Sequence, residues 1–233
     1  MSTYTKKPYV DRDTYISLDV ETTGPIPGPY AMLSLGAVAY NADGVEVGTW
    51  YKKFTMMEGS SWHLGTWTWW KDWPIAYAEA TSDQVYWKEA MASFIEWCGT
   101  FKKNGGSPIL MASPATFDGM FVNYYGVQVA GDFSGLPWKH RILDIRTYIH
   151  GITKFEFNRA IGKSAFEVLD YTDSNPNPHF ALDDARAQGE MYFAARKYRE
   201  EKLYKKKETW LTKPVSEDSS DVSADSESVS TVG

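Results

Sequence analysis

The sequence predicts an α/β domain built on a mixed five-stranded sheet. Three apolar segments within the first 54 residues follow one another through short turns, which is the pattern of an antiparallel meander. Two shorter apolar runs come later, between segments with helical spacing, as expected for buried parallel strands. The chain has 233 residues, of which 43% are hydrophobic and 15% aromatic, so it is long enough to bury one substantial core.

The first strand is predicted at the start of the stretch 15–40. Apolar Ile16, Leu18 and Val20 alternate there with Ser17, Asp19 and Glu21, and this period of two is typical of a strand with one apolar face. Asp19 and Glu21 therefore project from the same side, where two carboxylates repel each other unless a cation lies between them. A divalent metal with oxygen ligands is one interpretation, and a solvated polar face is the other.

The remaining elements follow from apolar spacing and turn residues. Residues 22–29 hold two glycines and three prolines and predict a turn, and the Asn-Ala-Asp-Gly sequence at 41–44 predicts another. Further strands are expected at 31–40, 45–54, 109–112 and 142–145. Helices are expected at 83–101, from near Asp118, in part of 148–167, and from 181 to about 203, with a loop at 170–178.

Residues 62–73 contain five tryptophans. Such side chains fill cores, and they also stack on nucleic-acid bases. No cluster of basic residues lies nearby, which favours core packing over base stacking. His63, within this segment, is interpreted as an ordinary histidine.

Charge and composition divide the chain into an N-terminal extension at 1–13, a domain at 14–211 and a disordered acidic, Ser-rich tail at 212–233. From Val215 onward the tail has five acids and no Lys or Arg, so this segment accounts for five of the six net negative charges and the remainder is close to neutral. The basic helix end at 196–208 is interpreted as a solvated face.

The single cysteine, Cys98, excludes an intrachain disulfide. The absence of a signal peptide or an apolar span predicts a cytoplasmic protein without a membrane partner.

Two further segments carry candidate ligands. Asp118 lies in ATFDGMF, just beyond a predicted buried strand, and His179, Asp183 and Asp184 lie in HFALDDARA at the start of the last helix. Each acid taken singly could be a helix N-terminal residue favoured by the helix dipole, and the histidine could be a cap.

Together, LDVETTGP, ATFD and HFALDDARA resemble the three motifs of the DEDDh 3′→5′ exonucleases (DnaQ-like, RNase T-like). This group contains RNase T, oligoribonuclease and polymerase proofreading subunits. The resemblance covers roughly residues 14–200. The phrases ETTGPIPGPYAMLSLGAVAY and TWTWWKDWP look most like phage and bacterial members.

The resemblance implies an RNase H-like fold and a two-metal mechanism. It implies that two Mg²⁺ ions, for which Mn²⁺ would substitute, are held by Asp19, Glu21, Asp118 and Asp184. It implies that His179 is the general base, which completes the catalytic set. The family spacing of four residues after the histidine selects Asp184 over Asp183, which points about 100° away around a helix.

The resemblance also suggests how a substrate is held. Thr22 and Thr23 follow Glu21 where the family's backbone meets the terminal nucleotide, and Phe117 and Trp70 are further substrate candidates. Asp144 corresponds to a family acid and is interpreted as structural, fixing the following helix. Many members have Asn four residues before the second-motif Asp, where this chain has Pro114, and this puts in doubt a contact behind the metal ligand.

The implied activity is 3′→5′ hydrolysis of phosphodiester bonds in single-stranded DNA or RNA, with release of nucleoside 5′-monophosphates. Two alternatives stay open: a polymerase-associated proofreading factor, whose acidic tail would tether a protein partner, and a nucleic-acid-binding protein that keeps the fold without cleaving. Several members of the group are dimers, which leaves a homodimer open as well.

Overall fold

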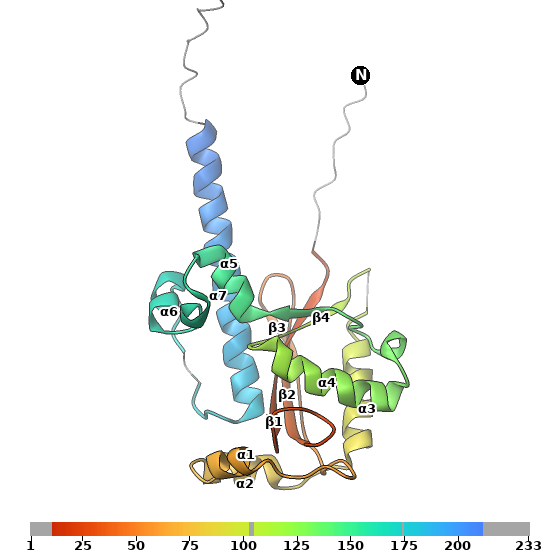
Figure 1. The fold of residues 1–233 in the computed structure, drawn as a ribbon. Helices are drawn as coiled ribbons and strands as arrows, with labels where there is room; N and C mark the ends of the chain where they lie inside the picture. The colour runs from red at the N-terminus through yellow and green to blue at the C-terminus, as the bar shows by residue number, and fades with distance from the viewer. Residues whose placement is uncertain (1–10, 103–104, 174, 212–233) are drawn as a thin grey trace, which may run out of the picture. The chain divides into compact units, whose positions relative to one another are not determined.

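The computed structural model describes residues 11–102, 105–173 and 175–211, with the backbone alone at 203–211. Its sheet has the strand order β3-β2-β1-β4-β5 (Figure 1). The strands are β1 Thr14–Thr22, β2 Met32–Tyr40, β3 Glu46–Lys53, β4 Pro108–Ala112 and β5 Ile142–Asp144. The β1–β2 and β2–β3 pairs are antiparallel, whereas β1–β4 and β4–β5 are parallel. The predicted mixed sheet is therefore confirmed.

The helices are α1 Leu64–Trp70, α2 Pro74–Thr81, α3 Trp87–Gly99, α4 Ala115–Ala130, α5 Ile145–Thr153, α6 Lys163–Leu169 and α7 Ala181–Leu211. The helix predicted at 83–101 is shorter at both ends in the structure, since α3 begins at Trp87 and ends at Gly99. The helix predicted from near Asp118 begins three residues earlier, at Ala115. The sequence missed α1 and α2. Apolar residues are spread over several sides of these two short helices, so no single apolar stripe marks them.

The two faces of β1 pack against different helices (Figure 1). Ile16, Leu18 and Val20 belong to a core cluster with residues of α3 and α4, such as Phe94 and Phe121. Tyr15 belongs to a second cluster, formed with Val38, Tyr40 and residues of α5 and α7. The period of two in the sequence thus separates the two layers, and it directs Asp19 toward α7, where its carboxylate meets Gln188.

The tryptophan-rich segment divides between core and surface. Trp70 is buried in a third cluster with Leu33, Ala76 and Ala80, which confirms core packing for this residue. Trp67, Trp69 and Trp73 keep 37–38% of their surface exposed. The segment therefore packs on β2 through one face and presents indoles on another.

The chain forms two units, residues 1–199 and 200–233. The predicted domain start coincides with the first residue of β1, Thr14. The predicted tail at 212–233 and most of the N-terminal extension lie outside the described residues. Among those residues, no helix combines the length and the apolar character needed to cross a membrane.

Gly36 allows α7 to begin directly on the sheet. It pairs with Asp19 across β1 and β2, and a Cβ at this position would lie 2.3 Å from the backbone of Ala181 and Leu182. Farther along both elements, Gly189 of α7 lies against the ring of Tyr40. Eight helical residues and four strand residues both span about 12–14 Å, so α7 runs along β2 from a start beside Asp19.

We expect Gly36→Ala to lower the free energy of unfolding by about 1–3 kcal/mol, because the added methyl group meets backbone atoms that cannot rotate away. Urea denaturation followed by circular dichroism measures this change. The control is Gly151→Ala within α5, where a Cβ meets no atom within 4 Å and should be neutral or stabilise by up to about 1 kcal/mol. Equal losses in the two variants would contradict the close approach of α7.

Candidate active site

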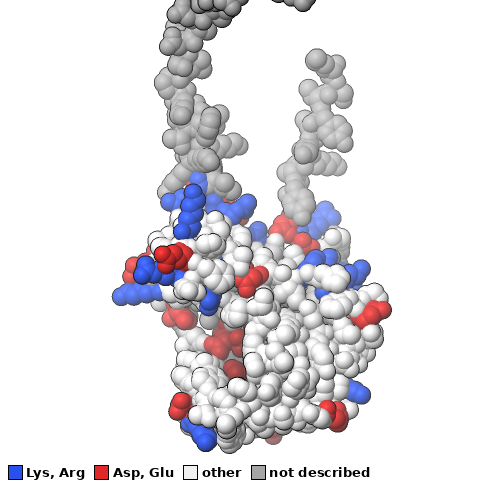
Figure 2. All heavy atoms as spheres, in the orientation of Figure 1, with Lys and Arg blue, Asp and Glu red and all other residues white. Residues whose placement is uncertain are grey.

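Four carboxylates gather at the carboxyl end of β1. Asp19 and Glu21 come from the strand itself, Asp118 from the first turn of α4, and Asp184 from the first turn of α7. Because β1 and β4 are parallel, the end of β1 and the start of α4 lie at the same edge of the sheet. Figure 2 shows acidic atoms inside a hollow on one face of the molecule.

Polar contacts orient the carboxylates of Asp118 and Asp19. The pairing of β4 with β1 ends at Ser17, and the amide of Val20 beyond it donates to Asp118 Oδ1 at 3.1 Å. Asp19 Oδ1 accepts from Nε2 of Gln188 at 2.9 Å. Gln188 was missed in the sequence, although it lies four residues after Asp184 and so on the same face of α7.

The adjacent acids of the third motif point in different directions. Asp184 accepts from the backbone amide of His179 at 2.8 Å and from the side chain of Asn175. Asp183 instead accepts from the side chain of Asn177 at 2.8 Å and lies 3.6 Å from the guanidinium of Arg186. Asp184, which the family spacing selects, is therefore the acid that faces Glu21.

Burial raises the pKa of all four carboxyl groups, and repulsion from nearby carboxylates raises it further. Burial raises the pKa of Asp19 and Glu21 well above the usual range, and the neighbouring carboxylates raise it further. Burial also raises the pKa of Asp118 to about 7 and that of Asp184 to about 6. Within the described part of the chain, no Lys or Arg forms an ion pair with any of these acids.

This donor set fits divalent cations. One ligand atom from each of Glu21, His179 and Asp184 lies within 4.8 Å of the other two. Carboxylate oxygens are the ligands that Mg²⁺ and Mn²⁺ prefer, and cations here would offset the repulsion among the buried acids. The arrangement can therefore bind metal.

His179 sits at the rim of the acidic cluster in a left-handed backbone conformation, with φ of 67°. Burial lowers the pKa of its imidazole, so the ring is neutral near pH 7 and able to accept a proton. Its ring contacts the indoles of Trp69 and Trp73.

Asp144 has the structural role expected from the sequence. It caps α5 by accepting from the amide of Thr147 at 2.7 Å. Its second oxygen accepts from the amide of Ala115, the first residue of α4, at 2.8 Å. Asp144 thus ties the start of α5 to the helix that carries Asp118.

A cavity of about 280 Å³ opens beside Glu21. Its lining comprises Val20, Glu21, Thr22, Gly24, Pro25, Thr66, Trp69 and Phe117. Of the predicted substrate residues, Thr22 and Phe117 therefore reach the cavity. Trp69 was not predicted, yet it reaches the cavity as well.

Thr23 and Trp70 lie behind this cavity instead. The hydroxyl of Thr23 is buried, donates to the carbonyl of Ser61 at 2.7 Å and accepts from the amide of Ala31 at 2.8 Å. Trp70 is 2% exposed and donates to the carbonyl of Thr22 at 3.0 Å. Successive helical residues differ by about 100°, so Trp70 points into the core while Trp69 faces the cavity.

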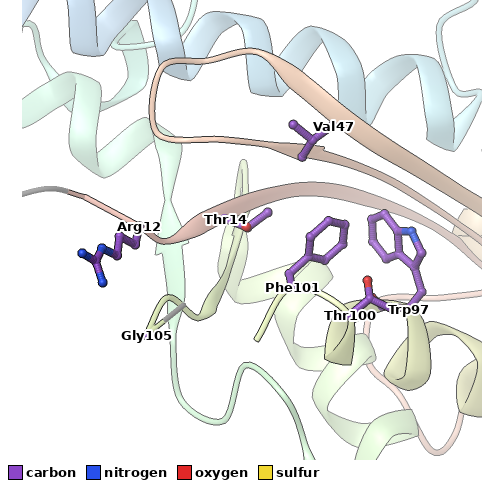
Figure 3. Close-up of a pocket in the computed structure, with 7 residues that line it drawn as sticks. All are labelled: Arg12, Thr14, Val47, Trp97, Thr100, Phe101 and Gly105. Carbon is purple, nitrogen blue, oxygen red and sulfur yellow. The ribbon is translucent and has the colours of Figure 1, made fainter. Parts of the chain in front are cut away.

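A second cavity, of about 1140 Å³, lies at the other end of β1 (Figure 3). Arg12, Thr14, Trp97 and Phe101 are among the residues that line it. Thr14 and Glu21 are seven strand residues apart, which is about 24 Å. None of the four acids lines this cavity, whereas Glu21 lines the cavity of about 280 Å³.

Solved structures of nucleases share this fold. The nuclease domain of 3′hExo, a DEDDh family member bound to rAMP, aligns with a TM-score of 0.59 and 15% identity over 81% of this chain and 92% of that chain. Escherichia coli exonuclease I in complex with single-stranded DNA aligns with a TM-score of 0.62 and 15% identity over 84% of this chain and 43% of that chain. The fold is thus the RNase H-like fold of DEDDh exonucleases, as the sequence predicted.

The chain belongs to the family of Rv2179c-like 3′-5′ exoribonuclease domains, which matches residues 14–195. Among curated proteins, the 3′-5′ DNA exonuclease Cap18 of Escherichia coli is 28% identical over 200 residues, covering 82% of this chain and 96% of that protein. The protein is therefore a metal-dependent 3′→5′ exonuclease, a hydrolase that acts on nucleic acid.

We expect Mn²⁺ at about 100 times its Kd to stabilise the wild-type protein by about 2.7 kcal/mol, since cations bind the folded site. Asp184→Asn should lose most of this gain, because one carboxylate oxygen available to the cation is replaced by an amide nitrogen. Thermal unfolding with Mn²⁺ and with EDTA measures both effects.

The matched control is Asp183→Asn, one residue away and bonded outside the cluster. This variant should keep the stabilisation by Mn²⁺. An equal loss in both variants would show that the cation does not distinguish the two acids, contrary to the geometry.

Proposed function

We propose that this exonuclease removes nucleotides one at a time from the 3′ end of single-stranded DNA or RNA and releases nucleoside 5′-monophosphates. The observation that carries the proposal is the cavity beside Glu21. Its volume of about 280 Å³ is near the lower end of small-molecule sites, which suits one nucleotide. The scissile phosphate of a nucleotide held there would face the acidic cluster.

We assign the metal ligands to Asp19, Glu21, Asp118 and Asp184, which would hold two Mg²⁺ ions, with Mn²⁺ as a substitute. When bound, the cations would supply electrostatic stabilisation of the charge that develops at the scissile phosphate. The hydrogen bonds of Asp19 and Asp118 keep these two acids oriented inward. Their fixed directions reduce the reorganisation needed when the substrate enters.

His179 is assigned the general base. Its neutral imidazole lies within reach of Glu21 and Asp184, at the rim where water enters. As the oxygen of a water molecule attacks phosphorus, the imidazole accepts the proton of that water. The bond from phosphorus to the 3′ oxygen of the preceding nucleotide breaks, and that oxygen takes a proton from solvent.

The cavity wall supports recognition of a base without sequence preference. Phe117 and Trp69 both line it, and aromatic faces stack on every base. Thr22, held from behind by Trp70, presents the backbone beside Glu21 to the 3′ end. The similar proteins are described as acting on RNA in one case and on DNA in another, which supports the inclusion of both sugars.

Asp19→Asn should lower nuclease activity by about 10³-fold or more, because cation stabilisation worth several kcal/mol is removed. His179→Ala should lower kcat by about 10²–10⁴-fold while the affinity for Mn²⁺, measured by calorimetry, changes little. The assay follows 5′-labelled single-stranded DNA and RNA with Mg²⁺, Mn²⁺ or EDTA. The expected product is a ladder that shortens from the 3′ end together with nucleoside 5′-monophosphates.

A substrate blocked by a 3′-phosphate is the control for polarity and should be degraded more slowly. Full activity of Asp19→Asn would contradict the metal site. A parallel loss of Mn²⁺ affinity in His179→Ala would make this residue a ligand instead of a base. Fragments from internal cuts would contradict exonucleolytic action.

A further inference from the structure

The imidazole of His179 is held edge-on by two indoles. Its ring centroid lies 4.7 Å from that of Trp69 at an interplanar angle of 84°, and 4.2 Å from that of Trp73 at 67°. Trp69 belongs to α1, and Trp73 precedes the first residue of α2. Residues more than 100 positions apart in the sequence thus meet at the proposed base.

The ring of His179 depends on these contacts for its orientation. Among the described residues, its ring nitrogens form no hydrogen bond, whereas catalytic imidazoles are commonly oriented by a partner on the second nitrogen. Its backbone is in the left-handed region at φ of 67°, where a side chain other than glycine needs support from its surroundings. Packing against aromatic edges is therefore the main restraint on this ring.

The backbone that carries the two indoles is anchored through Trp70. Between them in the sequence, Trp70 is buried against Leu33 and bonded to the carbonyl of Thr22. The amide of Trp73 donates to the carbonyl of Trp70 at 3.0 Å. The segment therefore connects the end of β1, which carries Glu21, to the ring of His179.

We propose that Trp69 and Trp73 are positioning residues for His179. This inference rests on the proposed role of His179 as the base. Trp69 also lines the cavity proposed for the nucleotide, so it contacts both the imidazole of His179 and the space for the substrate. Trp73 does not line the cavity, so its effect isolates the positioning of the imidazole.

Trp73→Ala should lower kcat by about 10–100-fold, because a misplaced catalytic group loses much of its effect. KM for a single-stranded oligonucleotide should stay within about twofold, and Trp73→Phe should recover part of the loss, since a smaller aromatic ring keeps an edge contact. Trp69→Phe should change KM as well as kcat.

A double-mutant cycle with His179→Ala tests whether Trp73 acts through the imidazole. In the His179→Ala background, Trp73→Ala should cause no further loss of kcat, because the group that it positions is gone. A double variant whose loss equals the product of the two single losses would overturn the inference.

The matched control is Trp67→Ala. Trp67 belongs to α1 and is 37% exposed, like Trp73, but it packs on Trp62 and Tyr77 and not on His179. The kcat of Trp67→Ala should equal that of wild type. Thermal unfolding of every variant distinguishes loss of the folded state from misplacement of the His179 imidazole. An equal fall in kcat for Trp67→Ala would overturn the inference.

The same measurements separate this inference from the proposed function. If His179→Ala keeps full kcat, the role of the histidine as base fails, and the positioning role fails with it. If His179→Ala is impaired but Trp73→Ala is not, the proposed function stands and only the inference is overturned.

Discussion

The central constraint on this molecule is the gathering of four carboxylates at one end of β1, with Glu21 and Asp118 buried, without a Lys or Arg partner among the described residues. Buried acids are costly unless their charge is compensated, and here burial and repulsion together raise the pKa of every one. Hydrogen bonds from Val20 and Gln188 orient the acids but do not neutralise them. Compensation must come from outside the chain, which is why this arrangement is suited to cations and to the phosphate that they attract.

The four acids come together because the fold brings β1, α4 and α7 to one edge of the sheet. Gly36 lets α7 start against the backbone of β2, opposite Asp19. The short pairing between β4 and β1 leaves the amide of Val20 available for Asp118. Asp144 joins the first residue of α4 to the start of α5. Together, these local contacts hold acids from distant segments of the chain close to one another.

The tryptophan-rich segment has more than one function in this arrangement. Trp70 fills the core and supports Thr22, Trp69 faces the cavity beside Glu21, and Trp73 packs on His179. Core packing and exposure are therefore not alternatives for this segment, since neighbouring residues on α1 point in different directions. The tryptophans of this segment thus contact both the end of β1, which carries Asp19 and Glu21, and the imidazole of His179, the proposed general base.

The sequence by itself determined the sheet, the acids and their common side, because the period of two in β1 and the short motifs are local properties of the chain. The cap that Asp144 forms on α5 is also local, whereas its second bond, to the amide of Ala115, depends on the tertiary structure. Only the tertiary structure decided that Trp69 and not Trp70 reaches the cavity, and that Gln188 meets Asp19. It also decided that two indoles meet His179. These contacts depend on the rotation of a short helix and on packing between residues more than 100 positions apart, and neither leaves a periodic signal in the sequence.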